Sequence, residues 1–282
     1  MRIGYVQTDP VFGDKRASFD RVDALCAGVR ADLLVLPELF ATGYTFESAE
    51  EAAGLAERAD GETADYIRGL ADRVGGAVVA GFAETDGRRV YNSALLADSR
   101  GVIGCYRKVH LFNREKLWFS PGGAVEPSGG CRSGTPPALR SFPVFRVGEV
   151  SVGLMICFDW IFPEAARTLA VGGADIIAHP ANLVLPYCQG AMRTRCLENR
   201  LFAITANRVG TEERGGDSFT FTGASQVTSP LGEVLASAPP EGTRVDVVEI
   251  DPVVARDKRL NPYNDLLGDR RPECYGGGPG SG

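Results

Sequence analysis

The sequence has few of the residues and motifs that mark metal-dependent or nucleotide-dependent proteins. It contains two histidines in 282 residues, and it has no H-E-x-x-H motif and no C-x-x-C pair, so the usual zinc-binding patterns are absent. It also lacks a G-x-x-x-x-G-K-[ST] loop and a G-x-G-x-x-G motif between a strand and a helix, which argues against binding of nucleotides or dinucleotides. We therefore expect neither a metal ion nor an organic cofactor.

Positive charge and long apolar runs are also scarce. The 30 lysines and arginines are outnumbered by 36 aspartates and glutamates, and there is no basic stripe suited to nucleic-acid phosphates. No apolar run approaches the roughly 20 residues that a membrane-spanning helix needs, and the first residues alternate as a strand does, unlike a signal peptide. The seven cysteines are scattered and odd in number, so a disulfide framework is not indicated. We expect a cytoplasmic protein that binds neither nucleic acid nor membranes.

Short β-rich runs alternate with longer helical patterns, which is typical of an α/β protein. From Ala77 to Arg107 several strand candidates follow one another without a helix, and this predicts an antiparallel meander inside a mixed sheet. The Gly-, Pro- and Ser-rich stretch from Ser120 to Pro137 predicts a loop, and residues 276–282 predict a flexible tail. Because the composition is similar on both sides of the loop, we expect residues 1–275 to form a single domain.

The predicted strands are Arg2 to Thr8, Asp32 to Leu36, Ala77 to Glu84, Tyr91 to Ala97, Val102 to Arg107, Phe142 to Val147, Val150 to Ile156, Asp175 to Ala178, Phe202 to Ala206, Gly223 to Thr228 and Arg244 to Ile250. The predicted helices are Lys15 to Arg30, Glu62 to Val74, Pro163 to Val171, Pro186 to Arg200 and a short one after Pro252.

The apolar strand that ends at Cys157 carries the most informative signal. Pro163 suits the first turn of a helix that follows it. A thiol at such a turn faces the start of a helix, where partial positive charge favours the thiolate. A nucleophilic cysteine also needs a base and a group that stabilises the oxyanion. A buried structural cysteine is the alternative, and a papain-like pair with His110 or His179 lacks the sequence context of that family.

Two other apolar strands also end next to charged residues. One leads to Glu38, and the other runs out into Arg107 and Lys108. Functional groups gather at the carboxyl ends of strands in α/β sheets, so these residues are candidates for the base and the cation that Cys157 requires. Taken singly, each is more often a solvated surface residue.

Together, these segments resemble the three signature regions of the nitrilase superfamily of carbon–nitrogen hydrolases. They occur in the family's order and at similar spacing, and the resemblance covers nearly the whole chain. In appearance the sequence is closest to the small archaeal-type nitrilases and amidases. The resemblance rests on Pro37-Glu38, on Arg107-Lys108-Val109-His110-Leu111, on Cys157-Phe158-Asp159 with Phe162-Pro163-Glu164, on His179-Pro180-Ala181-Asn182, on Arg195 to Arg200 and on Asn207 to Gly210.

The resemblance implies a four-layer α-β-β-α sandwich with two mixed β-sheets. It also implies a catalytic triad, with Glu38 as general base, Lys108 as oxyanion donor and Cys157 as nucleophile. A cation beside the thiol would lower its pKa, and the backbone N–H of Phe158 would be the second oxyanion donor. Glu115 matches a further glutamate of some relatives, which would position the substrate and hold the lysine; a surface carboxylate paired with its Arg or Lys neighbour is the alternative.

Three other residues are candidates for contact with the substrate. Asn182 would reach the substrate amide, and Tyr44 follows the Glu38 segment. His179 would line the pocket or, equally, order the loop through hydrogen bonds. The family resemblance also implies a homodimer or a higher homo-oligomer, with the segment from Tyr263 to Tyr275 reaching across the interface.

The implied activity is hydrolysis of a small amide to a carboxylic acid and ammonia through a cysteine thioester. Phe158-Asp159 after the cysteine looks like the amidase and carbamoylase branches, whereas many nitrilases carry Trp-Glu there. A nitrilase and an N-carbamoyl amidohydrolase therefore stay open. An acyl-transferring synthetase subunit and a non-catalytic binding member of the fold are further alternatives, and the filled triad positions argue against the last of these.

Overall fold

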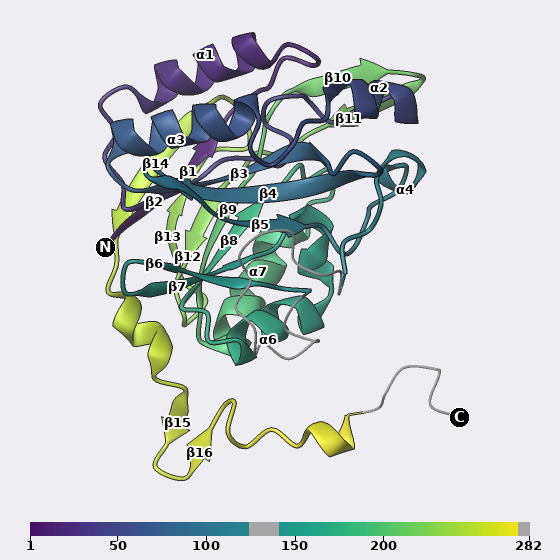
Figure 1. The fold of residues 1–282 in the computed structure, drawn as a ribbon. Helices are drawn as coiled ribbons and strands as arrows, with labels where there is room; N and C mark the ends of the chain where they lie inside the picture. Colours follow the sequence, from purple (N-terminus) through teal and green to yellow (C-terminus); the bar gives the residue numbers. More distant parts are fainter. Residues whose placement is uncertain (124–140, 276–282) are drawn as a thin grey trace.

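Two six-stranded β-sheets pack face to face in the computed structural model, which describes residues 1–123 and 141–275 (Figure 1). Strands β1, β2 and β3 of the first sheet run parallel, and the others are antiparallel to their neighbours. In spatial order this sheet consists of β14 (Arg244–Glu249), β1 (Arg2–Gln7), β2 (Leu33–Val35), β3 (Ala77–Thr85), β4 (Val90–Asp98) and β5 (Gly101–Arg107).

The second sheet repeats this mixed pattern. Strands β7, β8 and β9 run parallel, and antiparallel strands flank them on both sides. Its spatial order is β13 (Val234–Ser237), β12 (Gln226–Thr228), β9 (Phe202–Ala206), β8 (Ile176–Pro180), β7 (Val150–Leu154) and β6 (Val144–Val147).

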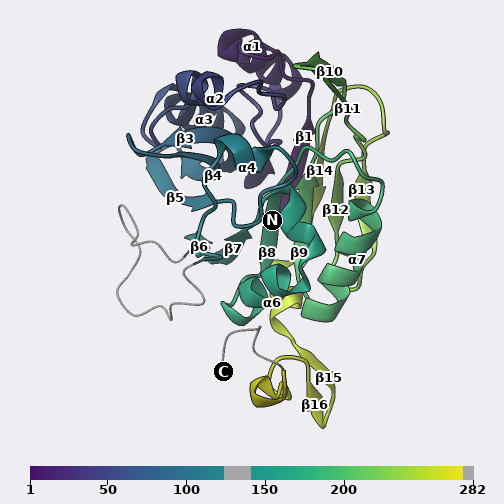
Figure 2. The same cartoon turned by 90° about the vertical axis from the view of Figure 1, so that its right-hand side faces the viewer.

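Helices cover the outer face of each sheet, as Figure 2 shows. Helices α1 (Lys15–Cys26) and α3 (Glu62–Val74) lie over the first sheet, and α6 (Pro163–Val171) and α7 (Cys188–Asn199) lie over the second. The predicted four-layer α-β-β-α sandwich is therefore confirmed. The antiparallel meander predicted from Ala77 to Arg107 is formed by β3, β4 and β5.

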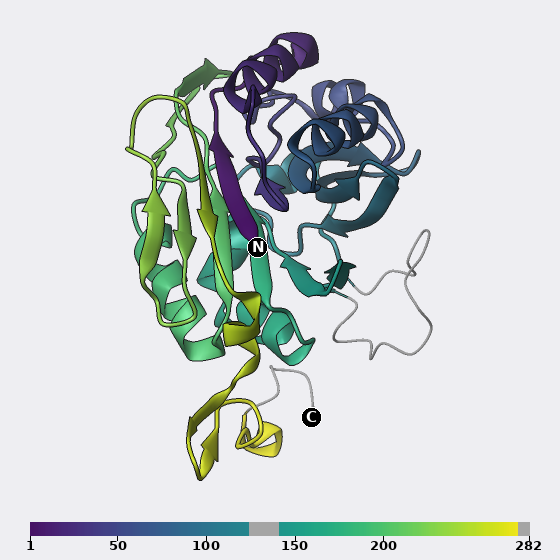
Figure 3. The same cartoon turned by 90° about the vertical axis from the view of Figure 1, so that its left-hand side faces the viewer.

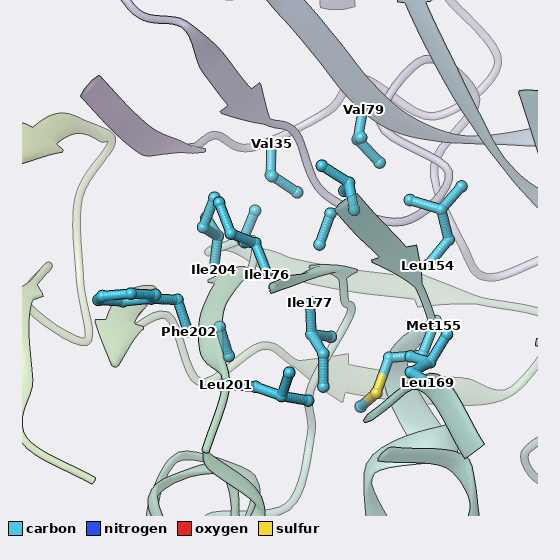
Figure 4. Packing of buried hydrophobic residues seen from close by; sticks show 14 of the residues in the cluster. Val35, Val79, Leu154, Met155, Leu169, Ile176, Ile177, Leu201, Phe202 and Ile204 are labelled. Atoms are coloured by element: carbon cyan, nitrogen blue, oxygen red, sulfur yellow. The ribbon is translucent and has the colours of Figure 1, made fainter. Parts of the chain in front are cut away.

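Strand alternation explains how the layers hold together. In β2 the side chains of Leu33 and Val35 join the core between the sheets, whereas Leu34 packs with helices α1 and α3. Figure 4 shows Val35 facing the second sheet, where Leu154 and Ile176 are among its partners in the core. Burial of each such side chain contributes about 1.5–3 kcal/mol, so the core fixes the spacing between the sheets.

Several short elements are absent from the sequence-based prediction. They are α2 (Ala49–Leu55), α4 (Glu115–Trp118), β13 and the hairpin of β10 (Thr211–Arg214) and β11 (Asp217–Thr220). The Gly215-Gly216 pair in the sequence could have indicated the hairpin, because a two-residue hairpin turn favours glycine. Both glycines have positive φ, of 58° and 81°, as such a turn requires. Strand β12 begins later than predicted because Gly223 and Ala224 also have positive φ.

The chain after β14 leaves the two sheets and extends away from them (Figure 3). It contains a 3₁₀-helix (Pro252–Arg256), strands β15 (Arg259–Asn261) and β16 (Asn264–Asp265) and a second 3₁₀-helix (Pro272–Cys274). Most of the predicted loop from Ser120 to Pro137 and the predicted tail 276–282 lie outside the described residues. Within the described ranges, no helix is long and apolar enough to cross a membrane.

Candidate active site

The predicted catalytic residues come from both sheets and meet at one edge of the sandwich. Glu38 follows β2 and Lys108 follows β5 in the first sheet, whereas Cys157 follows β7 and Asn182 follows β8 in the second. Strand β5 is antiparallel to β4, which is antiparallel to β3, so β5 ends on the same side as β2. The topology therefore gathers these side chains at the carboxyl ends of the strands, where α/β sheets place functional groups.

Lys108 lies between two carboxylates and is almost completely buried. Its Nζ donates to Oε1 of Glu38 at 2.6 Å and to Oε1 of Glu115 at 2.8 Å, and only 1% of the residue is exposed. Burial alone would lower the pKa of Lys108, but the negative charges of Glu115 and Glu38 outweigh it and raise the pKa. The side chain is thus a fixed cation whose position is set by two hydrogen bonds.

Glu38 has one oxygen that is held and one that is free. Its Oε1 accepts hydrogen bonds from Lys108 and from the side-chain amide of Asn92, both at 2.6 Å. Its Oε2 is buried and has no hydrogen-bond partner among the described residues. A buried acceptor without a donor costs free energy, so this oxygen is suited to receive a proton from a neighbouring group. Asn92, inside β4, is a site residue that the sequence analysis missed.

Glu115 begins the short helix α4 and holds Lys108 from the other side. It is 3% exposed, and the Tyr44 hydroxyl donates to its Oε1 at 2.8 Å. Its Oε2 accepts from the backbone N–H of Phe112 at 3.2 Å. Burial raises the pKa of Glu115 to about 7, in spite of the Lys108 cation. The alternative of an exposed carboxylate paired with a neighbouring Arg or Lys is therefore excluded by its burial.

Cys157 opens a 3₁₀-helix (Cys157–Ile161) at the end of the β7 segment. Its thiol is buried and donates to the backbone carbonyl of Asn182 at 3.7 Å. Burial and the charge of Glu38 raise the pKa of this thiol well above its ordinary value, and the opposing effect of Lys108 is smaller. Lys108 does lower the pKa of the thiol, as expected, but burial and Glu38 outweigh it, so the thiol rests in its protonated form. A protonated thiol needs a base for activation.

A small pocket opens at the cysteine and is mostly apolar. It is a shallow, open depression with about 240 Å³ of space between its walls, part of which is open solvent. Among the residues that the structure describes, no Lys, Arg, Asp or Glu lines this pocket, and neither polar atom of the buried Asn182 side chain has a hydrogen-bond partner. The lining residues are Phe112, Cys157, Phe158, Trp160, Asn182, Leu183, Val184 and Leu185.

The structure separates the four candidates for substrate contact into two groups. Phe158 and Asn182 line the pocket, but His179 and Tyr44 do not. The Tyr44 hydroxyl donates a hydrogen bond to Glu115, and the ring of His179 contacts the backbone carbonyl of Cys157. Direct contact of His179 and Tyr44 with a ligand in this pocket is therefore not supported. A larger open depression lies at the other ends of the strands, and none of its described lining residues is a cysteine or a lysine.

A buried carboxylate connects the lysine segment to the cysteine turn. Asp159 accepts hydrogen bonds from the Tyr106 hydroxyl at 2.7 Å and from the backbone N–H of Ile156 at 2.8 Å. Its Oδ1 is also 2.8 Å from Nδ1 of His110. Because Tyr106 and His110 flank Lys108 in the chain, these contacts fix the distance between the cation and the nucleophile.

Comparisons with known proteins identify the family of the chain. The family model of the carbon–nitrogen hydrolases matches residues 2–259. The chain belongs to the carbon–nitrogen hydrolase family. This confirms the resemblance to the nitrilase superfamily, and family membership supports an enzyme that acts on carbon–nitrogen bonds. Among the described residues, no group of three or more His, Cys, Asp or Glu side chains could hold a metal ion.

Relatives with full-length similarity carry both amidase and nitrilase names. The chain is 45% identical to a nitrilase of Pyrococcus abyssi, over 98% of this chain and 99% of that protein. It is 35% identical to an (R)-stereoselective amidase of Pseudomonas sp., over 96% and 92% of the two chains. An amidase from Nesterenkonia sp. AN1, solved after Michael addition of acrylamide at its active-site cysteine, has a TM-score of 0.74 and 29% identity, with 97% of each chain covered.

Proposed function

We propose that this carbon–nitrogen hydrolase cleaves small neutral amides to a carboxylic acid and ammonia, through a thioester on Cys157. The observation that carries the proposal is the arrangement around Lys108. A buried cation is clamped between Glu38 and Glu115, and Glu38 keeps one buried oxygen free. The charges of Glu38, Lys108 and Glu115 act on the protonated thiol of Cys157, which lines an apolar pocket. These are the base, the oxyanion donor and the nucleophile that acyl transfer requires.

In the first half of the reaction, Oε2 of Glu38 takes the proton from the Cys157 thiol. The sulfur attacks the amide carbon, and the carbonyl oxygen becomes an oxyanion that accepts hydrogen bonds from Nζ of Lys108 and from the N–H of Phe158. The tetrahedral intermediate collapses, the carbon–nitrogen bond breaks, and protonated Glu38 returns its proton to the leaving nitrogen. Ammonia leaves and the acyl group stays on the sulfur as a thioester.

In the second half, a water molecule replaces ammonia. Glu38 accepts one proton of this water, whose oxygen attacks the thioester carbon, and the same two donors stabilise the second oxyanion. The carbon–sulfur bond breaks, the acid leaves, and the proton returns to the sulfur. Lys108 does not change its protonation state, which is consistent with its raised pKa.

The pocket supports a short, neutral acyl group. A carboxylate or an ammonium group would lose hydration on entering it, and none of the described lining residues is a Lys, Arg, Asp or Glu that could compensate. This disfavours N-carbamoyl amino acids and carbamoylated polyamines as substrates. The side-chain amide of Asn182, which has no hydrogen-bond partner within residues 1–123 and 141–275, would hydrogen-bond a polar group of the substrate.

A nitrile is the second candidate substrate, because the Pyrococcus abyssi relative with 45% identity carries the name nitrilase. Attack on a nitrile gives a thioimidate, in which charge first develops on nitrogen, and the same donors serve it. The residues after the nucleophile favour the amide, since Phe158-Asp159 differs from the Trp-Glu pair of many nitrilases.

The test is a matched pair, propionamide and propionitrile, with ammonia and propionic acid both measured. We expect kcat/KM to be higher for the amide. A value for the nitrile at least about tenfold above that for the amide would make nitrilase the correct name. Activity on neither compound, combined with activity on N-carbamoyl compounds, would contradict the neutral acyl group.

A further inference from the structure

The ring of His179 lies directly behind the cysteine turn. It is fully buried in β8, and its Nε2 is 3.0 Å from the carbonyl oxygen of Cys157. Its Nδ1 is 3.2 Å from the hydroxyl of Thr205, the residue that pairs with it in the register of β8 and β9. Because His179 does not line the pocket, its partners are the turn and the neighbouring strand.

These two contacts determine which nitrogen of the ring carries the proton. A carbonyl oxygen can only accept a hydrogen bond, so Nε2 must carry the hydrogen that it donates to Cys157. Burial lowers the pKa of His179 to about 4, and the ring is therefore neutral near pH 7. In a neutral ring Nδ1 is an acceptor, and it accepts the hydroxyl hydrogen of Thr205.

The carbonyl that His179 holds belongs to a strained residue. Cys157 has a φ of 39°, a left-handed conformation that is unfavourable for a residue with a side chain and persists only where surrounding contacts maintain it. The hydrogen bond from His179 is one such contact, and the bond between the Ile156 N–H and Asp159 is another.

The orientation of this carbonyl also determines where the next N–H points. A trans peptide is planar, and its C=O and N–H point in opposite directions. When His179 holds the Cys157 carbonyl, the N–H of Phe158 is fixed on the other side of the same peptide plane. Among the described residues this N–H has no hydrogen-bond acceptor, and Phe158 lines the pocket.

We propose that His179 is a positioning residue that aims the second oxyanion donor: it holds the Cys157 carbonyl, and the Phe158 N–H is thereby directed at the substrate oxygen. The inference rests on the proposed function, because it requires a carbonyl-derived oxyanion at Cys157. Thr205 supports this role, because its hydroxyl donates to Nδ1 of His179 and so stabilises the tautomer that carries its proton on Nε2.

The experiment compares His179→Leu, which removes the donor, with His179→Gln, whose amide nitrogen reaches about as far as Nε2. Three quantities are measured: kcat on propionamide, the inhibition constant of propionaldehyde, and the rate at which methyl methanethiosulfonate modifies Cys157. The aldehyde forms a hemithioacetal whose oxygen needs the oxyanion donors. Disulfide formation by the thiosulfonate needs the thiol but no carbonyl oxyanion. Mass spectrometry of the Cys157 peptide separates it from the other six cysteines.

We expect His179→Leu to lower kcat and to weaken aldehyde inhibition by the same factor, roughly tenfold to a hundredfold, with KM and the modification rate of Cys157 within about threefold of the wild type. His179→Gln should recover most of the loss, and Thr205→Val should show a smaller loss of the same kind.

A His179→Leu variant with wild-type turnover and aldehyde inhibition would overturn the proposal. So would a parallel loss of turnover and thiol modification, since that result means that the cysteine itself is displaced. If propionamide is not hydrolysed by the wild type, the proposed substrate fails, and the aldehyde constant and the modification rate still decide the role of His179.

Discussion

Replacing Lys108 by methionine is the sharpest test of the charged cluster. Methionine has a similar length and no charge, so the change removes the cation without leaving a large cavity. It takes away the hydrogen bonds of 2.6 and 2.8 Å to Glu38 and Glu115, and two buried carboxyl groups then face each other without a cation between them.

The substitution should cause two separate losses, one of catalytic rate and one of stability. Removal of one oxyanion donor typically costs about 3 kcal/mol of transition-state stabilisation, which is at least about a hundredfold in kcat at 1.36 kcal/mol per factor of ten. Removal of one partner from a buried ion pair destabilises the fold by about 3–5 kcal/mol. The second loss should grow as the pH rises, because burial already raises the pKa of Glu115, loss of the Lys108 cation raises it further, and protonation at low pH relieves the repulsion between the two carboxyl groups.

The assay is steady-state kinetics on propionamide together with urea unfolding at about pH 5.5 and about pH 8. Lys116→Met is the matched control, because Lys116 is exposed on the same short helix, and we expect it to change neither kcat nor stability. The double variant Lys108→Met with Glu115→Gln should regain stability but not activity. If the single variant raises only KM, or if the double variant regains activity, Lys108 is a binding or structural residue and not the oxyanion donor.

Three further predictions concern the other members of the site. Cys157→Ala should abolish turnover and leave the thermal midpoint near that of the wild type; retained turnover, or inactivation by iodoacetamide through another cysteine, would remove the thioester mechanism. Asn92→Ala should lower kcat roughly tenfold with little change in KM, because Glu38 loses a hydrogen bond to a charged group; an unchanged kcat would mean that Lys108 alone positions the base. Because burial raises the pKa of Glu115 from 4.5 to about 7, its contribution to the free energy of unfolding is fully present below about pH 4.5 and is lost as the pH rises through about 7. The Glu115→Gln variant should lack this decline in urea unfolding, and an identical pH dependence in both proteins would contradict the raised pKa.

The residue pattern was sufficient to predict an α/β fold with Glu38, Lys108 and Cys157 at strand ends, whereas the four layers and the triad roles were implied by the resemblance to the nitrilase superfamily. Each of these residues follows a strongly apolar strand, and the carboxyl ends of such strands gather at one edge. Strand periodicity is a local property, so it can be read without knowing which strands are neighbours.

Properties that depend on several distant segments could not be predicted in this way. The raised pKa of the Cys157 thiol results from burial and from carboxylates on two other segments; motif order indicated the neighbouring charges but not that burial and the carboxylates outweigh the lysine. Asn92 is one polar residue in an apolar strand, and its role is visible only once β4 lies beside Glu38. The position of His179 next to the Cys157 turn follows from the pairing of β7 with β8, and its contact with Thr205 follows from the pairing of β8 with β9; the sequence specifies neither.

Because the catalytic groups are divided between two sheets, turnover depends closely on how the two sheets pack against each other. Glu38 and Lys108 move with one sheet and Cys157 with the other, so a small slip at the interface of Val35 and Leu154 changes the distance between base and nucleophile while every strand stays intact. Heating should therefore abolish activity before circular dichroism reports any loss of strands. Conversely, a better-filled interface between the sheets should extend the working temperature range of the enzyme even where it adds little to the midpoint of global unfolding.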